Sequence, residues 1–157
     1  MPDPSKTIRD WPPPLDSAEA PTKPDVSPVV AVVLATALER LGQRETGKNQ
    51  GAIVREVCAP FLSPERLERA YAAGKLEWCA AFACFCWRAG WPTMPRGMIS
   101  LEVPLLWARL GDAKFARYAV CRRDCVDPLP GDLIFFSSKT DRSAPVHVGL
   151  VQHVGTP

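Results

Sequence analysis

The run from Glu77 to Gly90, EWCAAFACFCWRAG, constrains the fold of this chain more than any other segment. It contains no Pro, and its first Gly is its last residue, so its alanine-rich sequence favours a helix that Gly90 would end. Apolar side chains recur on every face of this helix, so we expect it to be buried on nearly all sides. The sequence therefore predicts a domain built around one central helix.

Cys79 lies at the expected start of this helix and is a candidate nucleophile. The first N–H groups of a helix are unpaired and carry a partial positive charge, which stabilises a thiolate. We therefore expect the pKa of the Cys79 thiol to be lower than that of an ordinary cysteine. From the residues alone, a small side chain that packs in the core explains this cysteine at least as well.

Proline distinguishes the start of the chain from the rest, because eight of its 17 prolines lie in the first 28 residues. Such a segment is typical of an extended or disordered tether, which we assign to residues 1–27. Residues 28–157 are then long enough for one folded domain. The net charge of +2 comes without the clustered Lys and Arg of a nucleic-acid-binding protein. No apolar run approaches the ~20 residues of a membrane span, and no signal peptide is recognised.

The period of the apolar residues changes after Gly111, from helical spacing to the spacing of strands. A serine followed by a proline, at Ser27 and again at Ser63, is a favourable helix start. This order of elements predicts the α+β class, with N-terminal helices packed on a small antiparallel sheet. The expected helices are 28–41, 52–62, 64–73, 77–90 and 101–110, and the expected strands are 115–120, 132–137 and 146–154.

A cysteine nucleophile needs a general base, and the chain contains two histidines. His147 begins the last expected strand directly after a loop, so its imidazole can face the start of the Cys79 helix. With an ordinary pKa near ~6.5, it can exchange a proton with a thiol at neutral pH. His153 lies about 20 Å further along the same strand at ~3.3 Å per residue, so it cannot share this role. Taken alone, a histidine on a strand can also be a core residue.

Three motifs occur in a characteristic order: EWCAAF at residues 77–82, PGDLIFF at 130–136 and HVGLV at 147–151. Together they resemble the CHAP family of cysteine, histidine-dependent amidohydrolases and peptidases, which belongs to the papain-like superfamily. The polar segment 42–51 also resembles the stretch that precedes the nucleophile in many phage and bacterial members. The resemblance covers about residues 30 to 154.

The resemblance implies a papain-like fold and a peptidoglycan hydrolase, either an amidase or an endopeptidase, that uses no cofactor and no metal. Cys79 would attack an amide carbonyl in the wall peptide, and His147 would carry the proton. Trp78, Glu45 and Asn49 would contact the substrate. Trp78 fits a place in the core equally well, and Glu45 and Asn49 could instead cap the second expected helix. The protein would be made in the cytoplasm and would act at the cell wall or in the periplasm after lysis, injection or non-classical export, as a phage lysin, a tail-associated enzyme or a bacterial toxin.

The chain departs from the family after His147. Family members carry a Glu, Asp or Asn on a later strand that orients the imidazole, whereas here only Gln152 and His153 have suitable chemistry. We therefore expect a C-terminally truncated domain that lacks its last strands and leaves a free sheet edge, which a missing C-terminal segment or a partner chain would complete. The alternatives are a catalytically weak or inactive wall-binding or assembly module with the same fold, and a cytosolic thiol protease that acts on proteins.

The remaining polar and sulfur-containing residues are interpreted as structural. Asp132 in the Pro-Gly-Asp turn can accept backbone N–H groups at the entry to a strand. The other cysteines show no spacing typical of a zinc finger, so we expect reduced thiols in the core. These cysteines are Cys58, Cys84, Cys86, Cys121 and Cys125.

Overall fold

The computed structural model describes residues 27–116, 118–119, 127–140 and 144–152. Apart from Ser27, the tether predicted for residues 1–27 lies outside these ranges. The α-helices are α1 (Pro28–Leu38), α2 (Ala52–Cys58), α3 (Pro64–Ala72), α4 (Trp78–Gly90) and α5 (Val103–Leu110). Short 3₁₀ turns are η2 (Ala59–Phe61), η3 (Arg96–Met98) and η4 (Ala113–Phe115), and the strands are β1 (Leu133–Ser137) and β2 (Pro145–Leu150).

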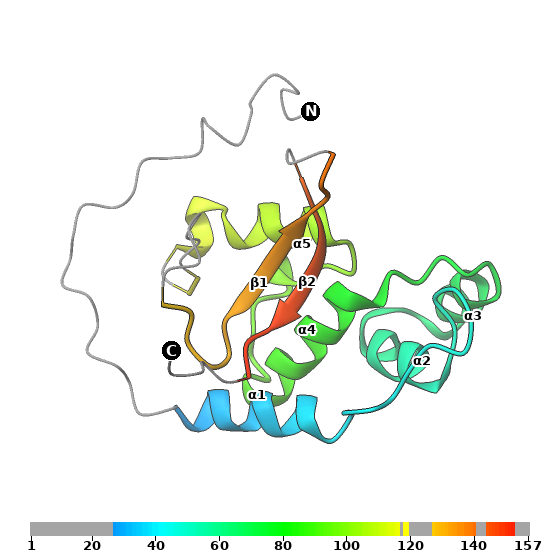
Figure 1. The fold of residues 1–157 in the computed structure, drawn as a ribbon, viewed down its shortest axis with the longest axis horizontal. Coiled ribbons are helices and arrows are strands. Elements are labelled where there is room, and N and C mark those ends of the chain that lie inside the picture. The colour runs from blue at the N-terminus through cyan, green and yellow to red at the C-terminus, as the bar shows by residue number, and fades with distance from the viewer. Residues whose placement is uncertain (1–26, 117, 120–126, 141–143, 153–157) are drawn as a thin grey trace.

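Helix α4 lies at the centre of the molecule, as predicted (Figure 1). It contacts α1, α2, α5 and β2, and its residues Ala80, Ala83 and Cys86 are buried. Its last residue, Gly90, permits the close approach of α1, because a Cβ atom at this position would clash with the backbone oxygen of Val29. The core is therefore organised around α4, and a glycine sets how closely α1 packs against it.

Local capping explains where two of the outer helices begin. The side chain of Ser27 accepts the N–H of Val30 at the start of α1, and Ser63 accepts the N–H of Arg66 at the start of α3. In both helices a proline follows the cap and occupies the first turn, where its missing N–H costs no hydrogen bond. Both predicted helix starts are confirmed.

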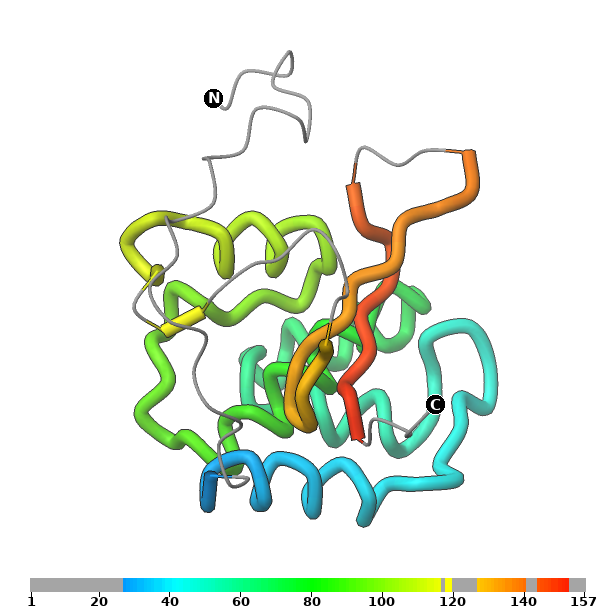
Figure 2. Tube along the Cα trace, turned by 60° about the vertical axis from the view of Figure 1, so that its left-hand side comes forward, coloured from blue at the N-terminus to red at the C-terminus, as the bar shows by residue number. Residues whose placement is uncertain are grey.

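Strands β1 and β2 form an antiparallel pair that packs over α4 and α5 (Figures 1 and 2). Phe136 lies opposite His147, and an extra residue on β2 next to this pair interrupts the register before Ser137 pairs with Pro145. Val148 points into the core, where it packs against α4 and α5. Helices combined with a small antiparallel sheet agree with the predicted α+β class, but two strands are too few to identify a papain-like fold.

The strand predicted at residues 115–120 is wrong. Phe115 instead ends the 3₁₀ turn η4, whose start is capped by the Asp112 carboxylate through the N–H of Lys114. The ring of Phe115 is buried against Met94 and Met98, so one apolar side chain anchors a turn rather than alternating along a strand. The last predicted strand is observed from Pro145 to Leu150, and its predicted end at residues 153–154 lies outside the described residues.

Over the described residues, the longest helices are too short or too polar to cross a lipid bilayer.

Candidate active site

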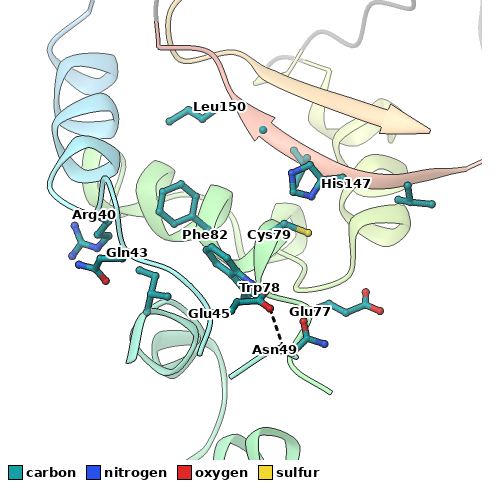
Figure 3. Close-up of a pocket in the computed structure, with 14 residues that line it drawn as sticks. Arg40, Gln43, Glu45, Asn49, Glu77, Trp78, Cys79, Phe82, His147 and Leu150 are labelled. Carbon is teal, nitrogen blue, oxygen red and sulfur yellow. Dashed lines mark hydrogen bonds between the residues drawn. The ribbon is translucent and has the colours of Figure 1, made fainter. Parts of the chain in front are cut away.

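A cavity of about 570 Å³ opens between the start of α4, the strand β2 and the segment that joins α1 to α2 (Figure 3). All five site residues predicted from the sequence line it: Cys79, His147, Trp78, Glu45 and Asn49. The structure therefore brings together residues that lie about a hundred positions apart in the chain. The other lining residues are Arg40, Gln43, Ile53, Glu77, Phe82, Val146, Val148, Gly149 and Leu150.

Cys79 is the second residue of α4, directly behind the helix start, and its side chain is half-buried. Burial raises the pKa of its thiol, and the negative charge of Glu77 acts in the same direction. The backbone N–H groups of Val148, Ala80 and Cys79 itself act on the sulfur and lower its pKa, but they do not offset the burial. The predicted lowering of the thiol pKa is therefore wrong, because desolvation exceeds the effect of the helix start.

The raised pKa has a chemical consequence for this site. At neutral pH the resting side chain is a thiol rather than a thiolate, so a base must remove its proton before or during attack on a substrate. His147 lies at the same end of the cavity as Cys79, whereas Arg40 and Gln43 lie at the other end (Figure 3). Val148, the residue after His147, lines the same cavity, and its backbone acts on the pKa of Cys79.

His147 is exposed on β2, and its ring lies beside that of Phe136 with the ring centres 6.0 Å apart and the planes inclined by 33°. The irregular register next to this pair adds Val146, which is 59% exposed and also lines the cavity. Bulges of this kind change the direction of neighbouring side chains. Among the described residues, no hydrogen bond to a ring nitrogen of His147 orients the imidazole; the packing against Phe136 does so alone.

Glu45 and Asn49 build the wall of the cavity opposite the sheet. The Glu45 carboxylate accepts the indole N–H of Trp78 and, at 3.2 Å, the backbone N–H of Asn49. The side chain of Asn49 donates to the backbone oxygen of Gly74 at 3.0 Å, and its φ of 53° allows the tight turn of this segment. These contacts tie the segment to Trp78 and Gly74. The predicted capping of the second helix by Glu45 or Asn49 is wrong, because α2 begins after Gly51 without a side-chain cap. Substrate contact stays a prediction.

Arg40 forms the far end of the cavity and was not predicted from the sequence. Its guanidinium binds Glu56 at 2.5 Å and lies 4.7 Å from the ring centre of Phe85. Its side chain is only 15% exposed, so its charge is already paired inside the wall. Glu77, the residue before α4, also lines the cavity and was not predicted; its charge acts on the thiol of Cys79.

The other described cysteines are buried and unbridged, as expected for core residues. Burial raises the pKa of Cys58 and of Cys84 to about 11 and that of Cys86 to about 12. Cys121 and Cys125 lie outside the described residues, and within those residues no three His, Cys, Asp or Glu side chains are grouped as a metal ion requires.

Asp132 has the structural role predicted for it. Its carboxylate accepts the backbone N–H of Leu129 at 2.8 Å and closes the turn that leads into β1. It does not line the cavity.

No protein-family model matches the chain, and searches among curated proteins and among solved structures find no match either. The functional interpretation therefore depends on the cavity and on the residues that line it.

Proposed function

We propose that this chain is a thiol-dependent amidohydrolase or peptidase that cleaves an amide bond in the peptide part of peptidoglycan. The observation that carries the proposal is that Cys79 and His147 line one open cavity, since a nucleophile and its general base must share a site that substrate can enter. The choice of peptidoglycan, and of a papain-like fold, follows from the resemblance of three ordered sequence motifs to the CHAP family.

The chemistry begins from a neutral thiol. Neutral His147 removes the proton of Cys79 while the sulfur attacks the carbonyl carbon, and the carbonyl electron pair moves onto oxygen. The backbone N–H of Cys79 at the start of α4 would stabilise this oxyanion, an effect worth about 3 kcal/mol in such sites. The imidazolium of His147 then protonates the leaving amine, which departs and leaves a thioester on Cys79. Water, deprotonated by His147, hydrolyses the thioester and releases the acid product.

The shape of the cavity supports a peptide-sized substrate. Its volume of about 570 Å³ falls in the range of ~300–1,000 Å³ typical of ligand pockets. Trp78, Phe82 and Ile53 provide apolar surface, and Arg40, Gln43, Glu45 and Asn49 provide polar groups. A short segment of a wall peptide can therefore enter with its reacting carbonyl at Cys79.

A second candidate is a wall-binding module that retains the cavity but does not cleave. Two observations favour it: the raised pKa of the Cys79 thiol, and a His147 ring that is oriented, within the described residues, only by Phe136. In related catalytic triads, loss of the orienting group lowers the rate by several orders of magnitude. This candidate predicts binding to peptidoglycan without release of new amino groups.

Digestion of purified peptidoglycan by the full chain separates these functions. We expect the wild type to release free amino groups, and Cys79→Ala and His147→Ala each to lower the rate by at least ~10²-fold. Cys86→Ala is the matched control, because it removes a thiol from the same helix without touching the cavity. Activity that persists in Cys79→Ala would contradict the proposal. Binding without release would support the second candidate, and cleavage of casein instead of peptidoglycan would indicate a protease acting on proteins.

A further inference from the structure

The charged side chains that line the cavity differ in how they are paired. At the far end, the guanidinium of Arg40 binds the carboxylate of Glu56 at 2.5 Å, so its charge is compensated within the wall. The carboxylate of Glu45 accepts two N–H groups of neighbouring residues. Glu77 lies at the end of the cavity that holds Cys79, and it is exposed (Figure 3). Within the described part of the chain, its carboxylate has neither a hydrogen-bond donor nor a cation as its partner.

Local effects do not explain a carboxylate at position 77. Glu77 is the N-cap residue of α4, but its side chain accepts no N–H group of the first turn. Its charge raises the pKa of the Cys79 thiol, which opposes formation of the attacking thiolate. What remains is an attraction to the partial positive charge of the helix start. Glu102 has the same attraction at the N-cap of α5, where it makes no capping hydrogen bond and lies outside the cavity.

The position of Glu77 limits where on a ligand its partner can lie. A carboxylate in a cavity attracts a cationic group of a ligand and repels an anionic one. One residue separates Glu77 from Cys79, so their Cα atoms are at most ~7 Å apart. Arg40, whose charge is already compensated, lies at the other end of the cavity (Figure 3). A cation bound at Glu77 therefore belongs to a residue within one or two positions of the bond that Cys79 attacks.

We propose that the cavity selects wall peptides with a free amine close to the scissile amide, and that the ammonium group of this amine binds the Glu77 carboxylate. This inference rests on the proposed function and names its substrate class. The amine is either the N-terminus of a peptide or the side chain of a diamino residue, since both present the same ammonium group. A cross-link acylates such an amine and removes its charge. The site therefore binds an unlinked wall peptide more tightly than the same peptide with its amine acylated.

Titration calorimetry of the full-length Cys79→Ala variant tests this selection without turnover. The probes are three forms of one synthetic wall peptide that contains a single lysine. The first form has a free N-terminus only, the second a free lysine amine only, and the third has both amines acetylated. At low salt we expect one of the free-amine forms to bind at least ~5-fold more tightly than the acetylated form, and this form identifies the source of the amine. The preference should shrink in about 1 M salt, where the screening length is about 3 Å.

A second substitution in the same background assigns the preference to Glu77. Glu77→Gln keeps the size of the side chain and removes its charge, so we expect the three forms to bind with equal affinity. Glu102→Gln is the matched control, because it removes the same charge from a helix start outside the cavity, and it should keep the preference. Equal affinities of the three forms for Cys79→Ala would overturn the inference. A preference that persists in Glu77→Gln, or no binding of any form, would also overturn it.

The result of this titration is separate from the test of the proposed function. If the wild type releases amino groups from peptidoglycan but the titration shows no preference for a free amine, the inference fails and the proposed function stands. If the wild type releases none, the proposed function fails. A preference that depends on Glu77 would then still support the inference and would assign the cavity to the wall-binding module.

Discussion

The first turn and the middle of α4 place the same residue type in opposite environments. Cys79, in the first turn, is half-buried and lines the cavity. Cys84 and Cys86, one to two turns later, are buried, and the sulfur of Cys84 donates to the backbone oxygen of Ser100 at 3.4 Å. Position along the helix, rather than residue type, therefore separates a candidate nucleophile from core packing.

The difference arises from what surrounds each turn. The start of α4 lines an open cavity together with β2, while its later turns are enclosed by other elements and contribute to the core. Desolvation raises the pKa of Cys84 to about 11 and that of Cys86 to about 12, and at Cys79 the backbone N–H groups oppose the same effect. The comparison can be tested by reactivity, by stability and by charge.

The largest expected difference is in alkylation of the native protein. We expect iodoacetamide at pH 8 to modify Cys79 at least ~10³-fold faster than Cys86, because Cys86 must wait for local or global opening. Mass spectrometry of the labelled peptides over time measures both rates. Similar rates at the two positions would mean that the cavity does not expose Cys79. Labelling of the urea-unfolded protein, where both should react alike, is the control.

For stability we expect the opposite order, with Cys86 contributing more than Cys79. We expect Cys86→Ala to lower the free energy of unfolding by about 1 kcal/mol, since it leaves a small void in a close-packed interior. Cys79→Ala should cost less, because its side chain borders an open cavity. Urea unfolding of both variants at pH 7 measures the difference. A larger loss in Cys79→Ala would indicate that Cys79 is primarily a packing residue.

Alkaline pH should destabilise the fold through the buried thiols. Their pKa values of about 11 to 12 exceed the ordinary value of 9.0, so below pH 9 both the folded and the unfolded chain hold these protons. Above pH 9 the unfolded chain releases them first, and the free energy of unfolding falls until the pH passes the folded values. Urea unfolding between pH 7 and pH 10.5 measures this slope. Cys86→Ala should reduce it, and an unchanged slope would show that Cys86 ionises as easily when folded.

The smallest expected effect concerns Glu77. Its charge helps to raise the pKa of the Cys79 thiol, so Glu77→Gln should move the pH dependence of Cys79 alkylation toward lower pH. Glu65→Gln, at an exposed site in α3, removes the same charge away from the cavity and should leave the curve in place. Identical curves for Glu77→Gln and wild type would mean that solvent screens this carboxylate.

Features decided by neighbouring residues could be predicted from the sequence. Ser27 and Ser63 cap helices because the cap, the proline and the first turn are adjacent in the chain. The central helix was predictable because no face of it is polar. The strand assigned near Phe115 failed because a single capping contact from Asp112 outweighed a short apolar run.

Features that depend on contacts between distant segments were harder to predict from the sequence. The thiol pKa was predicted in the wrong direction because the burial of Cys79 depends on β2, about seventy residues later. The resemblance in the order of motifs led us to expect Cys79 and His147 in one site. Neither local segment alone contains information about the position of the other.

The dimensions of the cavity also depend on Gly90, which has no Cβ atom and lies at the end of α4 far from Cys79. Because Gly90 has no side chain, α1 can lie directly against the end of α4, with Val33 Cγ2 only 2.9 Å from where a Cβ would be. Arg40, two residues beyond α1, then closes the distal end of the pocket. A larger residue at position 90 would push α1 outward, and Arg40 at the far end of the cavity would move with it. The length of cavity available to a substrate therefore depends on a residue at the end of α4 opposite Cys79.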